Sequence, residues 1–198
     1  IRSNLSINMS EIIPKNQYIA INGEEYFRIV MTIKDSHTSM DLFTDLINTS
    51  IESSLNDLNK PKNEILKTLI KIEDLSETSY LIKNKKFHSY IDKNINGFFK
   101  LGNSFELDLS ANKFNEGFYI YLDLNELNLD DIFYTQTESD GGVPIKEIQI
   151  KTKKFNFLNN LYNNQSINIL FKDEIEARLS GKDLDGSINI DKTNFIKI

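Results

Sequence analysis

The sequence predicts an α+β protein: a mainly antiparallel β-sheet, either a sandwich or a partly open barrel, with one long amphipathic helix and one or two short helices packed on it. Two observations lead to this prediction. Short segments of alternating apolar and polar residues recur between turn-forming residues, as in antiparallel strands joined by tight turns. One longer segment repeats its apolar residues at helical spacing.

The first strands are expected after a short irregular segment over residues 1–16. "YIAINGEEYFRIVMTI", residues 18–33, alternates on both sides of Asn22-Gly23. Asn-Gly between alternating segments is the strongest short signal for a tight hairpin. We therefore expect two paired strands here.

The long helix is predicted over about residues 39–59. Thr38 or Ser39 would cap it, Asp41 completes a capping box with Thr38, and Pro61 would end it. The apolar residues at helical spacing are Phe43, Leu46, Ile47, Ile51, Leu55 and Leu58. This pattern gives one apolar face, which we expect to lie on the sheet.

The shorter elements follow the same reasoning. Residues 64–82 suit a helical turn followed by a strand pair, and residues 87–96 suit a short helix that stops at Gly97. Residues 105–127 alternate clearly and predict two paired strands, and residues 155–164 fit another short helix. We find no repeat or linker, and expect a single domain over residues 1–198.

Composition restricts the function. The chain has 198 residues and a formal net charge of −6, which disfavours nucleic acid and anionic membranes as partners. Two lysine clusters, at residues 83–87 and 151–155, would bind nucleic acid only if they shared one face, and a solvated surface explains them more simply. Cysteine is absent, which excludes disulfides and thiolate chemistry.

The compartment is predicted only in outline. No apolar run is long enough for a transmembrane helix, so we expect a soluble protein. The sequence begins with Ile instead of Met, which favours a processed, exported chain.

Carboxylates are the one abundant catalytic residue type. Asp123, Glu126, Asp130 and Asp131 lie close together in the sequence, and a pair of them would suit a carboxylate-dependent hydrolase acting on glycans. Leucine and isoleucine residues alternate with these acids, however, as in an edge strand with its acids on the solvent side. We therefore keep the hydrolase as the alternative function.

A calcium site is a weaker candidate. "GKDLDGSINIDK", residues 181–192, resembles the middle of a calcium-binding loop, with Asp183, Asp185 and Asp191 as the candidate ligands. The two anchoring positions of such a loop are occupied by Gly181 and Lys192, which do not bind calcium. A β-turn at Asp185-Gly186 between two strands is the better interpretation. No cofactor motif is present.

Exposed aromatic residues are the candidate contact surface. Tyr119, Tyr121, Phe133 and Tyr134 would place aromatic rings on one face of the sheet, although a second layer of core explains them equally well. With few catalytic residue types, the sequence favours a non-enzymatic protein-binding or assembly module, part of a larger particle or of a secretion or surface assembly. It would contact another protein, or another copy of itself, through a sheet edge or an aromatic sheet face.

Overall fold

The computed structural model describes residues 2–12, 19–34, 37–73, 79–107, 114, 116–128, 145–172 and 174–191. The chain divides into two compact units, Ile1–Asn94 (unit 1) and Ile95–Ile198 (unit 2), and each is described by itself. The single domain over residues 1–198 stays a prediction.

Nearly all of the described secondary structure is β. The helices in the described part of the chain are α1 (Met9–Ile12), a single turn, and the 3-10 helix η1 (Asn56–Leu58). The predicted α+β class is therefore wrong. Both units are built from strands, and no long amphipathic helix lies on either sheet in the residues described.

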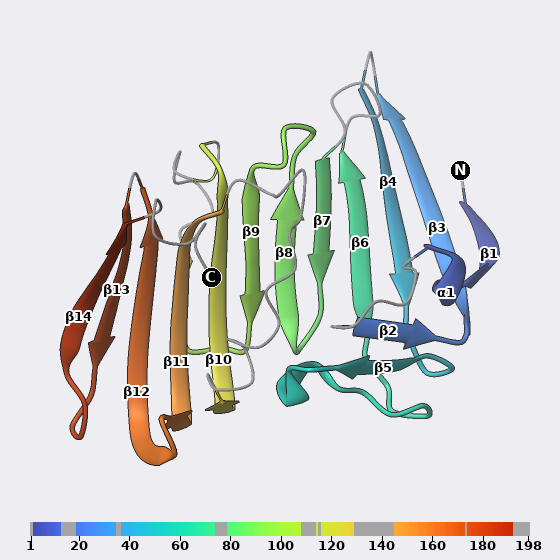
Figure 1. The fold of residues 1–198 in the computed structure, drawn as a ribbon. Helices are drawn as coiled ribbons and strands as arrows, with labels where there is room; N and C mark the ends of the chain where they lie inside the picture. The colour runs from blue at the N-terminus through green and yellow to red at the C-terminus, as the bar shows by residue number, and fades with distance from the viewer. Residues whose placement is uncertain are drawn as a thin grey trace. The chain divides into compact units, whose positions relative to one another are not determined.

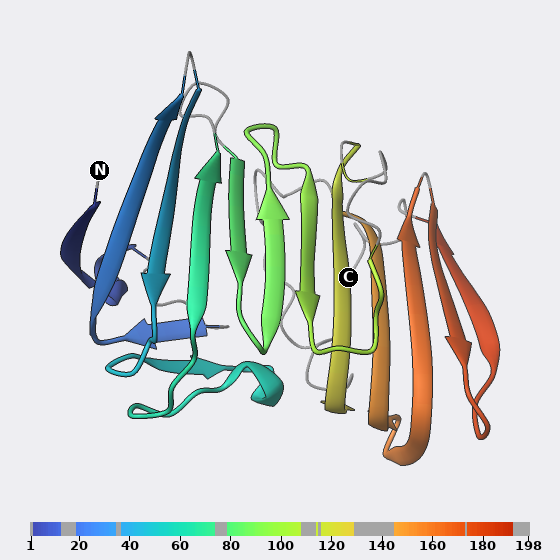
Figure 2. The same ribbon diagram turned by 180° about the vertical axis from the view of Figure 1, so that it is seen from behind.

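Unit 1 contains a six-stranded antiparallel sheet. Its strands, in spatial order, are β1 (Arg2–Asn8), β3 (Glu24–Lys34), β4 (His37–Thr44), β6 (Thr68–Glu73), β7 (Ser79–Lys83) and β8 (Phe87–Ile91). Two further strands, β2 (Ile19–Asn22) and β5 (Ser50–Ser53), pair with each other. They run across one end of β4 and β6 (Figures 1 and 2).

The core of unit 1 lies on one face of this sheet. Met9 of α1, Ile21 of β2 and Ile51 of β5 form a buried cluster with Phe27 and Leu42 of the sheet. Alternate residues of a strand point to opposite faces, so Arg28 and Phe43 lie on the other face. That other face carries the pocket described below.

The long helix predicted over residues 39–59 is replaced by β4, β5 and η1. In β4, Leu42 and Thr44 are buried on one face, while Phe43 faces the other way. Leu46 has a φ of 47°, which interrupts any helix at that point. Residues 43–59 combine the helical apolar spacing with β-branched residues, and strand pairing in the folded chain overrides the helical pattern.

Both predicted short helices are also wrong. Residues 87–91 form β8, which pairs with β7. Residues 155–164 form the tight hairpin between β11 and β12, with Leu158 and Asn159 at φ values of 50° and 60°. Two successive positive φ values are typical of a type I′ turn.

The first predicted hairpin is confirmed in its two strands, but the pairing predicted between them is wrong. β2 and β3 follow each other around Gly23, yet β2 pairs with β5, and β3 pairs with β1 and β4. Gly23 has a φ of 127°, and a methyl group there would lie 2.3 Å from the Asn48 carbonyl oxygen. The Asn22-Gly23 turn therefore connects β2, in the two-stranded sheet, to β3, in the six-stranded sheet.

Unit 2 contains a mixed six-stranded sheet. The strands, in spatial order, are β9 (Gly97–Leu101), β10 (Phe118–Asn128), β11 (Ile145–Phe157), β12 (Asn160–Phe171), β13 (Glu174–Ser180) and β14 (Gly186–Asp191). β10 runs parallel to both of its neighbours, and the other pairs are antiparallel. The predicted partner of β10 over residues 105–109 is wrong where the structure describes it, because residues 105–107 form no strand and β9 and β11 flank β10. Residues 108–109 lie outside the described residues.

The predicted C-terminal hairpin is confirmed. β13 and β14 pair in antiparallel register, and residues 181–185 connect them. The stretch that resembles a calcium loop thus lies at a hairpin turn.

Candidate functional site

The two described acidic candidates, Asp123 and Glu126, lie on opposite faces of β10, because they are three residues apart in a strand. The Asp123 carboxylate accepts hydrogen bonds from the backbone N–H groups of Asn103, at 3.3 Å, and Ser104, at 3.2 Å. Glu126 instead accepts a bond from the Asn156 side-chain amide at 3.0 Å. Asp130 and Asp131 lie outside the described residues, so no acid–base pair is brought together in the part described.

The predicted tyrosines pack against the connection between β9 and β10. Tyr121 is 2% exposed, and its ring centroid lies 5.5 Å from that of Phe105. Tyr119 makes an edge contact with Phe114, with centroids 5.6 Å apart. The Tyr121 ring therefore belongs to the core of unit 2. Phe133 and Tyr134 lie outside the described residues.

The calcium candidates are separated along the final hairpin. Asp183 and Asp185 are exposed in the turn, whereas Asp191 is at the far end of β14, in register with Glu174. A strand rises about 3.4 Å per residue, which puts Asp191 roughly 17 Å or more from the turn. Among the described residues, no group of three His, Cys, Asp or Glu side chains could hold a metal ion.

Gly181, at the start of this turn, has a structural role. A methyl group at Gly181 would lie 2.3 Å from the amide of Gln165, whose side chain is 1% exposed. The glycine in the calcium-like sequence thus allows the turn to pass close to a buried side chain.

An apolar row crosses unit 2 and ends at an exposed strand. The registers of five successive strand pairs place six residues side by side on one face of the sheet: Phe99, Ile120, Ile148, Ile169, Ala177 and Ile188. The inner residues of the row are half-buried, but Ile188 on β14 is 48% exposed. The apolar surface therefore continues to the edge of the sheet.

β14 forms that edge. In the part of the chain that the structure describes, β14 has one neighbouring strand, β13. It contains neither proline nor lysine, and Asp191 is its only charged residue. Proteins commonly protect edge strands with such residues, so β14 is an edge with little protection against strand addition. Sequence reasoning identified this strand but could not identify it as an edge.

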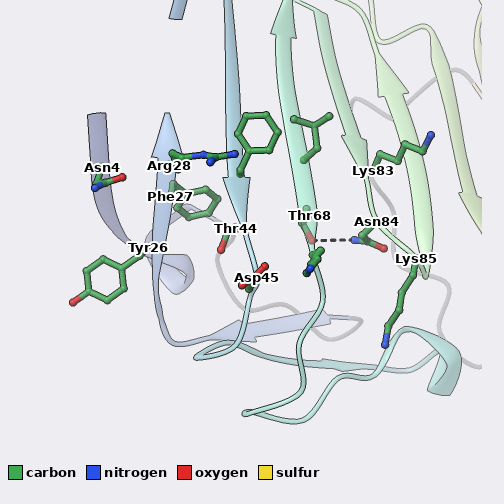
Figure 3. A pocket seen from close by; sticks show the side chains of 13 residues that line it. Asn4, Tyr26, Phe27, Arg28, Thr44, Asp45, Thr68, Lys83, Asn84 and Lys85 are labelled. Carbon is green, nitrogen blue, oxygen red and sulfur yellow. Dashed lines mark hydrogen bonds between the residues drawn. The ribbon is translucent and has the colours of Figure 1, made fainter. Parts of the chain in front are cut away.

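The pocket of unit 1 was not predicted from the sequence. It has a volume of about 1060 Å³ and lies on the face opposite the core cluster, lined by residues of β1, β3, β4, β6 and β7 and of the segments next to them. Arg28, Phe43, Leu69 and Lys83 form one cross-strand row through it. Figure 3 shows Arg28 extending across the sheet, and Lys83 and Lys85 on either side of Asn84.

Unit 1 also contains a buried lysine. Lys60 is 1% exposed, and its ammonium donates hydrogen bonds to the carbonyl oxygens of Thr49, at 2.6 Å, and Pro61, at 3.1 Å. Burial lowers the pKa of Lys60, although Glu64 and Glu25 oppose this shift. Glu25, itself buried, accepts a hydrogen bond from the Thr49 hydroxyl. Because its donors bond to backbone carbonyls, Lys60 serves to hold the loop after β4 in place.

Comparison with known proteins found no matching protein-family model, no similar curated protein and no similar solved structure. None of the helices described is long and apolar enough to cross a membrane.

Proposed function

We propose that this chain is a protein-binding or assembly module that contacts its partner through the β14 edge of unit 2. The observation that carries the proposal is the apolar row that ends at the half-exposed Ile188 on an edge strand. A strand from another chain would pair with the side of β14 that faces away from β13 and cover Ile188. This is the binding mode called β-augmentation, in which backbone hydrogen bonds provide affinity and side chains provide specificity.

The expected gain in free energy comes from two sources. Full burial of an isoleucine contributes roughly 1.5–3 kcal/mol, so burying the exposed half of Ile188 contributes about 1 kcal/mol. Each new backbone hydrogen bond adds about 0.5–1.5 kcal/mol. Several such bonds along the six residues of β14 would support a specific complex.

The partner in this proposal is a protein strand, either from another protein or from a second copy of this chain. Nothing in the described residues favours the alternative hydrolase, because Asp123 and Glu126 face opposite sides of the sheet.

The proposal is tested by placing a charge on the edge. Ile188→Lys should weaken self-association, or binding to a partner purified from the source organism, by about tenfold or more, because the added strand would have to cover a lysine. Sedimentation velocity over a range of concentrations measures self-association, and titration of the purified partner measures binding.

Tyr80→Lys is the matched control. Tyr80 is 42% exposed and lies on β7 of unit 1, where it is paired with Ile72 on one side and Ile91 on the other. The same substitution there should leave association unchanged. Equal effects of the two variants would contradict the proposal, as would a chain that stays monomeric and binds no protein of its source organism.

A further inference from the structure

We propose that the pocket of unit 1 binds a small organic anion that carries a planar apolar group. The volume of about 1060 Å³ is close to the range of small-molecule sites, which is roughly 300–1,000 Å³. All of its lining residues belong to unit 1. The inference is independent of the β14 edge, which belongs to unit 2.

The charge of the pocket favours an anionic ligand. Four cationic side chains line it, from Arg28, Lys67, Lys83 and Lys85, and Asp45 is the one acidic residue of the lining. The whole chain carries a formal charge of −6, so this positive site is a local exception. A concave site lined mainly by one sign of charge attracts ligands of the opposite sign.

Two of these cations are available to a ligand. The side chains of Lys67 and Lys83 are exposed and form neither a hydrogen bond nor an ion pair with any residue that the structure describes. Lys85 is already 3.3 Å from a carboxylate oxygen of Glu64. We therefore assign the anionic group of the ligand to Lys67 and Lys83.

The apolar residues that line the pocket favour a ligand with a planar apolar group. Phe43 and Leu69 lie side by side in the cross-strand row, and both are half-buried. The Arg28 guanidinium carbon lies 4.8 Å from the centroid of the Phe43 ring, in a cation–π contact. A flat aromatic group can pack on this surface, because both the ring and the guanidinium are planar.

The spacing of the strands sets the size of the ligand. Arg28 and Lys83 are three strands apart, which at about 4.8 Å per strand places their backbones roughly 14 Å apart. A molecule with its planar group stacked on the Arg28 guanidinium, which lies over Phe43, and with its anionic group toward Lys83 spans about two strand spacings. One or two fused rings with an attached acidic group fit this length.

Hydrogen bonds hold the lysine side of the pocket in position. The Asn84 side-chain oxygen accepts bonds from the backbone N–H groups of Lys86, at 2.9 Å, and Phe87, at 2.8 Å. Its amide nitrogen donates to the Thr68 hydroxyl at 3.4 Å (Figure 3). These bonds order the turn after Lys83 before any ligand arrives, which reduces the entropy cost of binding.

Anilinonaphthalene sulfonate is a suitable probe, because it joins a planar aromatic group to an anion. Its uncharged analogue, phenylnaphthylamine, has the same rings without the sulfonate. We expect saturable binding of one sulfonate probe per chain, seen as increased fluorescence, with weaker binding at high salt. The uncharged analogue should bind at least about threefold more weakly, because it cannot pair with a lysine.

Single substitutions in the pocket test where the probe binds. Lys67→Gln and Lys83→Gln should each weaken sulfonate binding by about three- to tenfold and leave the uncharged analogue unaffected. Asp45→Asn should strengthen sulfonate binding, because it removes the acidic group from the pocket. Lys34→Gln, an exposed lysine of β3 outside the pocket, is the matched control and should change nothing.

Circular dichroism first shows that each variant is folded, so that a loss of binding can be attributed to the substitution itself. Selective weakening by the two pocket lysine variants, with no effect of Lys34→Gln, supports the site. Equal binding of both probes would show a purely apolar surface and overturn the proposal. No saturable binding, or equal effects of all the lysine variants, would overturn it as well.

Discussion

At the scale of single residues, the calcium-like stretch shows how one sequence pattern can satisfy a different physical requirement. Gly181 fills a position where a calcium loop would need a charged ligand, and the structure places it against the buried Gln165 side chain. Asp183 and Asp185 are exposed in the turn, and Asp191 lies at the other end of β14. The glycine is therefore explained by close packing.

Gly181→Ala tests this explanation. The added methyl would lie 2.3 Å from the Gln165 amide, and relieving that contact should lower the free energy of unfolding by about 1–3 kcal/mol. Chemical denaturation measures the change. Gly186→Ala is the control, since a methyl there meets no atom within 4 Å. Equal destabilisation by the two substitutions would refute the packing role of Gly181.

At the scale of elements, residues 155–164 show why helical spacing alone was misleading. Phe155, Leu158, Leu161 and Tyr162 recur at helical intervals, but Phe155 and Tyr162 are cross-strand partners in a hairpin. Leu158 is 67% exposed at the turn, so the apolar spacing does not mark a buried helix face. An Asn-Gly pair would have indicated a hairpin, but the two turn positions are occupied by Leu158 and Asn159.

Restoring the usual turn residues tests the hairpin. In Leu158→Asn combined with Asn159→Gly, both positions keep positive φ with less steric cost, so the free energy of unfolding should rise by about 1 kcal/mol. Thermal and chemical denaturation measure this change. A helix at residues 155–164 would instead be destabilised by the new glycine, so a fall in stability would contradict the hairpin.

At the scale of the whole molecule, local patterns predicted several strands but not their partners. Alternation correctly marked the strands around Gly23, the strand in the 118–124 region and the final hairpin. The pairing of β2 with β5 joins segments about 30 residues apart in the sequence, and the parallel pairing of β10 depends on connections that alternation does not describe. Pairing of this kind is decided by the fold as a whole.

The same limit applies to the candidate sites. The sequence indicated acids and tyrosines on one strand because they are neighbours in the chain. The pocket residues Arg28, Phe43, Leu69 and Lys83 come from four strands, and only the register brings them together. The edge position of β14 likewise follows from the order of strands in unit 2.

The most direct test of the edge proposal is amide hydrogen exchange along β14, measured for the free chain and for its complex with a protein partner or a second copy. In the complex, backbone N–H groups of residues 186–191 that point away from β13 should exchange more slowly, because a new strand accepts their hydrogen bonds. The amides of residues 166–170 of β12, which are paired with β11 on one side and β13 on the other, should change little. Unchanged exchange across β14 in a fully formed complex would show that the partner binds elsewhere and would contradict the proposed function.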